Sequence, residues 1–244
     1  MKVIAVLIPT FTIEYSLDIL SGISDYFRGK EAKVVIIQTR IPGVNQGAFD
    51  YQYCTGFEYA KSKEVDAIIS VSGIYASQME EEKVREILRS FDPRPVISIA
   101  LDPQTRNGYS IQADCRKCFK EIVNHLKKEH GCKKIAFFSA NETKSKEALE
   151  RYDAFTSALD SSKLTFYPDL VFDGAFTDFK AYDVIKKRYK SRSEVDFDAI
   201  VCANDMMASG CMRAFEEIGV RVPDDVKVIG FDDAIVAKML TPKL

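Results

Sequence analysis

The sequence predicts an α/β protein of two doubly wound lobes, each a parallel sheet covered by helices, with a ligand cleft between the lobes. Three observations lead to this prediction. Short apolar segments alternate with longer amphipathic segments along the whole chain, as in repeated strand–helix–strand units. Several of the short segments are almost continuously apolar, which is typical of strands covered on both faces. A polar, turn-rich stretch at residues 101–109 interrupts the alternation.

The predicted strands are short and recur along the whole chain. They cover residues 3–8, 33–38, 67–71, 95–100, 110–112, 134–139, 170–172, 199–202 and 226–231. The predicted helices lie between them and include residues 15–28, 49–62, 80–89, 114–129, 146–159, 178–189 and 205–218. Four strand segments precede the polar stretch and a new series follows it. We therefore expect residues 1–104 to form an N-terminal lobe and residues 105–236 to form a C-terminal lobe.

The composition excludes several classes of protein. A chain of 244 residues that is 46% hydrophobic and 29% charged is an ordinary globular sequence. The formal net charge of −2 offers no basic surface, so we expect this segment itself to make no contact with nucleic acid. The apolar start at residues 3–9 is too short for a signal peptide, and no segment is long enough to span a membrane. We therefore expect a cytoplasmic protein with reduced cysteines.

The sequence contains no pattern typical of catalysis. It lacks the Gly-x-Ser-x-Gly elbow of hydrolases and the glycine fingerprint of dinucleotide-binding proteins. His125 and His130 are five residues apart on one predicted helix, a spacing that does not place them on one face. Cys115 and Cys118 have the spacing of a zinc or redox motif, but the helical stripe that continues to Phe119 assigns Cys115 to the core. We expect no enzymatic activity, no cofactor and no metal.

Ligands of open parallel sheets bind beyond the carboxyl ends of the strands. That rule nominates polar and aromatic residues that directly follow the predicted strands. They include Thr10, Asn141, Phe176, Asn204 and Asp232. Two such sheet edges that face each other form a cleft, which is the usual place for a small ligand.

Four elements in the second half of the chain carry a specific resemblance. They are Glu150-Arg151-Tyr152, Asp173-Gly174-Ala175-Phe176, Ala203-Asn204-Asp205-Met206-Met207-Ala208 and Gly230-Phe231-Asp232-Asp233. With the Val-Pro-Asp-Asp-Val segment at residues 222–226, they resemble the effector-binding domain of the lactose-repressor (LacI/GalR) family. That domain shares its fold with the type I periplasmic sugar-binding proteins. The resemblance covers nearly the whole chain, weakly before Ala60 and strongly after Tyr109.

The resemblance implies reversible binding of a small polar effector between two lobes that close. It makes Arg151 a guanidinium that reaches the ligand from a helix. It makes Phe176 an aromatic ring that packs against the ligand, and it makes Asn204 and Asp232 hydrogen-bond partners of ligand hydroxyls. Thr10 and Tyr15 match positions that line the cleft from the first lobe. Tyr75 is added from its loop position alone.

Each of these residues also has a purely structural interpretation. Arg151 follows Glu147 by four positions, which suits a surface ion pair on a helix. Phe176 can pack on its own lobe, and an aspartate such as Asp232 is common in turns. Asn204 or Asp205 has to cap the helix that starts there. We expect Asp205 to be the cap and Asn204 to face the cleft.

The resemblance also sets expectations for the whole protein. Family repressors carry a helix-turn-helix headpiece, so any contact with DNA is expected through such a headpiece and not through residues 1–244. We expect residues 237–244 to begin a return crossing to the N-terminal lobe, the chain to be truncated there, and the domain to form a homodimer. The sequence identifies neither the effector nor the output domain. The alternative function is a transport-type solute-binding protein, which delivers its ligand rather than sensing it.

Overall fold

The computed structural model describes residues 1–40, 49, 51–140 and 146–244. The chain divides into two compact units, Met1–Ala113 and Asp114–Leu244. We had expected the boundary after residue 104. It falls later because the strand at Gly108–Ile111 (β5) forms parallel backbone pairs with Val96–Ile99 (β4), so β5 belongs to the first sheet.

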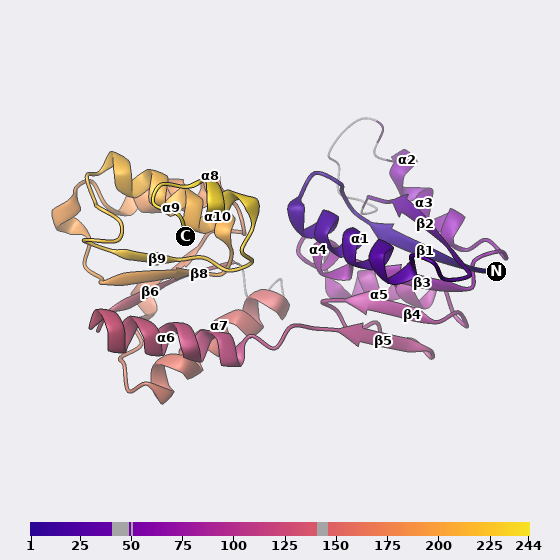
Figure 1. The fold of residues 1–244 in the computed structure, drawn as a ribbon, viewed down its shortest axis with the longest axis horizontal. Coiled ribbons are helices and arrows are strands. Elements are labelled where there is room, and N and C mark those ends of the chain that lie inside the picture. Colours follow the sequence, from indigo (N-terminus) through magenta and orange to yellow (C-terminus); the bar gives the residue numbers. More distant parts are fainter. Residues whose placement is uncertain (41–48, 50, 141–145) are drawn as a thin grey trace. The chain divides into compact units, whose positions relative to one another are not determined.

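The first unit is a parallel sheet flanked by helices (Figure 1). Within the described residues the sheet has the strand order β2-β1-β3-β4-β5, with β1 (Lys2–Ile8), β2 (Ala32–Gln38) and β3 (Ala67–Ser70). The helices are α1 (Glu14–Phe27), α2 (Tyr51–Cys54), α3 (Gly56–Ala60), α4 (Ser72–Ala76) and α5 (Glu81–Arg89). The strands are paired in parallel throughout, which confirms the predicted class of fold.

One predicted helix of the first unit, at residues 49–62, differs in the structure. Two short helices, α2 and α3, lie there on either side of Thr55. Glycine weakens a helix, and Gly56 begins α3 at a point of close packing, where a Cβ atom would lie 2.6 Å from Cγ2 of Thr39. Position 56 therefore has to be glycine, because any larger side chain would clash with the end of β2. The same glycine weakens a continuous helix, so two short helices form instead.

The second unit is a smaller parallel sheet with the order β7-β6-β8-β9 in the part of the chain that the structure describes. Its strands are β6 (Ile135–Ser139), β7 (Val171–Asp173), β8 (Ala199–Cys202) and β9 (Lys227–Ile229). Its helices are α6 (Arg116–His130), α7 (Lys146–Ser161), α8 (Asp178–Arg188), α9 (Asp205–Glu217) and α10 (Ile235–Met239), with short 3₁₀ turns at Pro168–Leu170 and Arg192–Glu194. Helices α6 and α7 lie on one face of this sheet, and α8 and α9 lie on the other (Figure 1).

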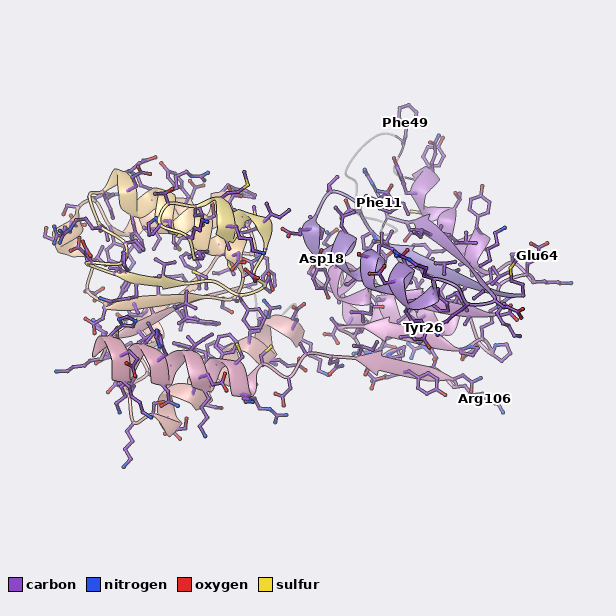
Figure 2. All side chains as sticks on the ribbon, in the orientation of Figure 1. Phe11, Asp18, Tyr26, Phe49, Glu64 and Arg106 are labelled. Carbon is purple, nitrogen blue, oxygen red and sulfur yellow. The ribbon has the colours of Figure 1, made fainter. Side chains whose placement is uncertain are left out.

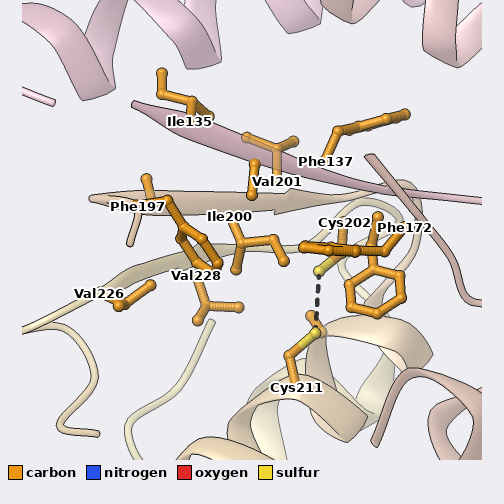
Figure 3. Packing of buried hydrophobic residues seen from close by; sticks show 14 of the residues in the cluster. Ile135, Phe137, Phe172, Phe197, Ile200, Val201, Cys202, Cys211, Val226 and Val228 are labelled. Carbon is orange, nitrogen blue, oxygen red and sulfur yellow. Dashed lines mark hydrogen bonds between the residues drawn. The ribbon is translucent and has the colours of Figure 1, made fainter. Parts of the chain in front are cut away.

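The core of the second unit consists of aromatic and aliphatic side chains from the strands and the helices that cover them. Phe137 of β6 is fully buried and stacks on Phe155 of α7, with ring centres 4.5 Å apart. On the other side of the sheet, Cys202 of β8 and Cys211 of α9 bring their sulfur atoms within 3.9 Å (Figure 3). Both cysteines are free and fully buried, and burial raises the pKa of the Cys211 thiol. They therefore pack as small apolar residues.

Figure 2 shows the side chains of both units on this framework, with large apolar side chains such as Phe11, Tyr26 and Phe49 at the surface of the first unit. None of the helices in the described residues combines the length and the apolar character that crossing a membrane requires.

Candidate functional site

The carboxyl edge of the second sheet brings together four of the seven predicted site residues. Phe176, Asn204 and Asp232 follow β7, β8 and β9, in that order. Arg151 comes from the middle of α7, the helix after β6. Parallel strands end at the same edge of a sheet, so residues far apart in the sequence meet in one place. We call Arg151, Phe176, Asn204 and Asp232 the Arg151 cluster.

Arg151 is the centre of this cluster and is only 6% exposed. Its Nη1 donates a hydrogen bond to the carbonyl oxygen of Ala203, and its Nη2 donates to the carboxylate of Glu147. The same Nη2 lies 3.8 Å from Oδ1 of Asp232. The ion pair with Glu147 therefore forms, as the structural interpretation predicted. This ion pair does not lie on the surface, because the Arg151 guanidinium is buried. The guanidinium also reaches the loop that carries Asp232.

Two aromatic rings complete the surroundings of the guanidinium. Its central carbon lies 4.3 Å from the ring centre of Phe231 and 5.8 Å from that of Phe176. A cation close to an aromatic face is stabilised electrostatically. The Nε of Arg151 is buried and has no hydrogen-bond partner among the described residues. A buried donor without a partner is costly, so this nitrogen is a candidate contact for a bound ligand.

Asn204 is the residue that caps α9, a role we had expected of Asp205. Its backbone is extended, its Oδ1 accepts a hydrogen bond of 2.9 Å from the amide of Met207, and it is therefore the N-cap of α9. Its Nδ2 donates to the carbonyl oxygen of Phe176 at 3.1 Å. The expectation that Asp205 caps this helix is wrong, because Asp205 is already the first helical residue. The Asn204 amide instead ties the start of α9 to the loop that carries Phe176.

Asp205 holds the loop at residues 230–234 in place through a hydrogen bond. This role was not predicted from the sequence. The side chain of Asp205 is only 3% exposed, and Oδ2 accepts a hydrogen bond of 2.8 Å from the amide of Ala234. A Cβ atom at Gly230 would overlap Oδ1 of Asp205. The glycine of the Gly-Phe-Asp-Asp element thus allows the loop at residues 230–234 to approach this carboxylate. Asp205 thereby holds the loop in which Asp232 lies.

Two residues of the cluster have left-handed backbone conformations. The φ angles are 58° at Phe176 and 108° at Asp232. Such conformations are unfavourable for residues other than glycine, and they concentrate at functional loops, where the surrounding structure enforces them. Here the Asn204 and Asp205 hydrogen bonds hold the two loops in place.

The three predicted residues of the first unit have different surroundings. Thr10 accepts a hydrogen bond of 3.0 Å from the amide of Thr12, and Tyr15 lies in the first turn of α1 with 40% of its surface exposed. Tyr75 is only 2% exposed and its hydroxyl bonds with that of Thr39, while burial raises its pKa. A loop position predicted Tyr75 as a ligand contact, but α4 turns its ring into the core. Thr10 and Tyr15 stay predictions, and Asn141 lies outside the described residues.

Comparison with known proteins identifies the family. A family model described as the periplasmic binding protein-like domain matches residues 123–244. The chain belongs to this family. The matched segment holds all four residues of the Arg151 cluster, so the candidate site lies in the part of the chain that identifies the family. This periplasmic binding protein-like domain is of the effector-binding type found in LacI/GalR regulators, as its motifs predicted.

Similar proteins are transcriptional regulators, not enzymes. The HTH-type transcriptional repressor PurR of Haemophilus influenzae (strain PittEE) is 36% identical over 187 residues, which cover 77% of this chain and 53% of the repressor. The chain therefore spans about half the length of the curated relatives it matches.

Solved structures with the same fold come from this group of regulators. A LacI family transcriptional regulator from Enterococcus faecium with bound ribose has a TM-score of 0.74 and 21% identity, covering 100% of this chain and 82% of that one. The dimeric Lac repressor with an 11-residue C-terminal deletion has a TM-score of 0.79 and 21% identity, covering 99% and 82%. These likenesses confirm the predicted fold of the periplasmic binding protein-like domain.

Proposed function

We propose that this chain is the ligand-sensing domain of a LacI-type transcriptional regulator and that effector binding acts by closure of its two lobes. The observation that carries the proposal is the Arg151 cluster. A buried guanidinium, an asparagine, an aspartate and an aromatic ring converge at the carboxyl edge of one sheet. A few fixed polar groups beside an aromatic ring are the usual means by which a protein orients a small polar molecule.

The chemistry of the cluster favours a ligand rich in hydroxyl groups. Glu147 and Asp232 supply carboxylate oxygens, which accept hydrogen bonds. The Arg151 Nε supplies a donor that no described residue uses. An aromatic ring such as Phe176 can pack on the apolar face of a sugar ring. The structural neighbour from Enterococcus faecium has ribose bound, which supports a sugar or a related polar effector for this chain as well.

The alternative of a transport-type solute-binding protein has no support from the relatives, which are repressors. We propose that the domain is not an enzyme and that the regulator is cytoplasmic. We also propose that DNA is contacted by another segment of the whole protein, because residues 1–244 carry a net charge of −2 and phosphate contacts need a basic surface.

The function is tested by screening sugars, sugar phosphates and nucleobases for thermal stabilisation of residues 1–244. A true effector at about a hundred times its dissociation constant should stabilise the domain by roughly 2.7 kcal/mol. Small-angle X-ray scattering with and without that compound should show a smaller radius of gyration in its presence, since closure compacts a two-lobed protein. Chemical turnover of the bound compound, or binding without compaction, would contradict a sensor that works by closure.

We propose further that the domain forms a homodimer, to which the first unit contributes an apolar groove. The groove has a volume of about 330 Å³ and is lined by Leu20, Ile23, Ser24, Phe27, Arg28, Ala32, Val34 and Ile36. These residues come from α1, from β2 and from the turn between them, and β2 is an edge strand of its sheet. Ile36 leaves 47% of its surface exposed. Exposed apolar surface of this kind is typical of a protein interface.

Ile36→Lys should weaken self-association at least about tenfold, because it places a charge in the apolar groove proposed as the interface. Sedimentation velocity over a range of protein concentrations measures this change. Tyr59→Lys is the matched control, since it adds the same charge at an exposed aromatic residue of α3 outside the groove. A wild-type monomer at every concentration, or equal weakening by both variants, would argue against this groove as the interface.

A further inference from the structure

A pair of histidines at the end of α6 has no role in the Arg151 cluster. His125 and His130 are both exposed, and their Nε2 atoms lie 3.1 Å apart. Their spacing of five residues predicted that they would not meet. They do meet in the structure, where His130 is the last residue of α6 and Gly131 follows it in a left-handed conformation with a φ of 66°. The two rings close over the end of the helix.

The geometry of the pair matches two ligands of one metal ion. Zinc binds imidazole nitrogen at about 2.0–2.1 Å, so nitrogens on neighbouring coordination positions lie roughly 2.9–3.4 Å apart. The observed separation of 3.1 Å falls in this interval. The ring centres are 4.8 Å apart and the ring planes are inclined at 79°. The ring centres are therefore farther apart than the two nitrogens, as they are when two imidazoles direct their Nε2 atoms at one ion.

The position on the helix also favours a cation. The carboxyl end of a helix carries a partial negative charge from carbonyl groups without helical partners. Lys127 and Lys128 oppose this effect, but Lys127 is turned away because its Nζ donates to the carbonyl oxygen of Ser162. Of the two glutamates of α6, Glu129 stands next to His130, whereas Glu121 pairs with Lys117 at 3.9 Å.

We propose that His125 and His130 form a surface site for one divalent transition-metal ion such as Zn²⁺ or Ni²⁺. Imidazole is a preferred ligand of these ions. No group of three or more potential ligands occurs among residues 1–40, 49, 51–140 and 146–244, so water completes the coordination. The bound ion links His125 to His130 across the last turn of α6 and stabilises the end of this helix. The site is independent of the effector site.

Calorimetric titration of the metal-free chain with Zn²⁺ and with Ni²⁺ tests the proposal. One equivalent of metal should bind, and His125→Gln and His130→Gln should each weaken binding at least about tenfold, because two linked ligands bind far more tightly than one. Glutamine keeps a side chain that can hydrogen-bond to the remaining histidine, so the variants separate metal binding from a simple hydrogen bond. Both positions are exposed, and circular dichroism confirms that the variants fold.

Cys118→Ser is the matched control, because Cys118 is the exposed thiol on the same helix. This variant should bind the metal as the wild type does. The proposal is overturned if the wild type shows no saturable binding of one equivalent, if both histidine variants bind as tightly as the wild type, or if Cys118→Ser alone removes binding.

Discussion

Replacing Arg151 by alanine should abolish most of the stabilisation that the effector gives. The change removes charge-assisted hydrogen bonds worth roughly 1.5–3 kcal/mol each, which corresponds to about a tenfold to hundredfold loss of affinity. At an effector concentration that stabilises the wild type by about 2.7 kcal/mol, a hundredfold weaker variant gains only about 0.4 kcal/mol. Thermal unfolding with and without the compound found in the ligand screen measures the difference.

Because Arg151 is buried, its replacement also changes the stability of the free domain. The unfolding temperature of each variant with effector is therefore compared with that of the same variant without effector. The Arg151 guanidinium bonds to Ala203 and Glu147, so Arg151→Ala also lowers the stability of the free domain by leaving the buried carbonyl of Ala203 without a donor. Arg151→Lys is the conservative variant. It keeps the positive charge but loses the planar arrangement of hydrogen-bond donors. Glu147→Ala removes the ion pair together with one of the two carboxylates proposed to accept from the ligand, and Asp232→Asn tests the second carboxylate. If Arg151→Ala keeps the full stabilisation by the effector while Asp232→Asn loses it, Arg151 has only a structural role.

Periodicity predicted the fold, and the strand-end rule together with the family resemblance predicted the members of the Arg151 cluster. Each predicted strand segment overlaps a strand of the structure, because continuous apolar runs report burial on both faces directly. Phe176, Asn204 and Asp232 were predicted because they follow strands of one parallel sheet, and such positions converge at one edge. Arg151 lies within α7 and was predicted from the family resemblance. Whether these residues bind the effector stays a prediction that the variants above test.

Side-chain direction at chain turns was not predictable from the sequence. Asn204 and Asp205 are both good caps, and only the backbone rotation at the end of β8 decides which of them precedes the helix. Tyr75 follows a strand as Thr10 does, yet a turn of helix directs its ring into the core beside Phe57, with ring centres 5.8 Å apart. Phe231 was overlooked as a partner of Arg151, although it directly precedes Asp232 in the Gly-Phe-Asp-Asp element.

Asp205→Ala should destabilise the second unit and weaken effector binding together. The change removes the acceptor of the half-buried Ala234 amide, a loss of about 1 kcal/mol. It also releases the loop in which Asp232 holds a φ of 108°, so the carboxylate facing Arg151 loses its fixed position. Urea unfolding measures the loss of stability, and faster hydrogen exchange at the Ala234 amide reports the released loop without any ligand.

Two further variants separate support of the loop from a general loss of stability. Asp205→Asn has the same shape and keeps an acceptor oxygen, so its effects should be smaller than those of Asp205→Ala. Gly230→Ala leaves Asp205 intact but forces the loop away from it, because the added methyl group would overlap Oδ1. Gly230→Ala should therefore weaken effector binding in the same way as Asp205→Ala. If Asp205→Ala lowers stability while the exchange rate at Ala234 and the effector affinity stay at wild-type values, Asp205 stabilises α9 alone and does not position Asp232.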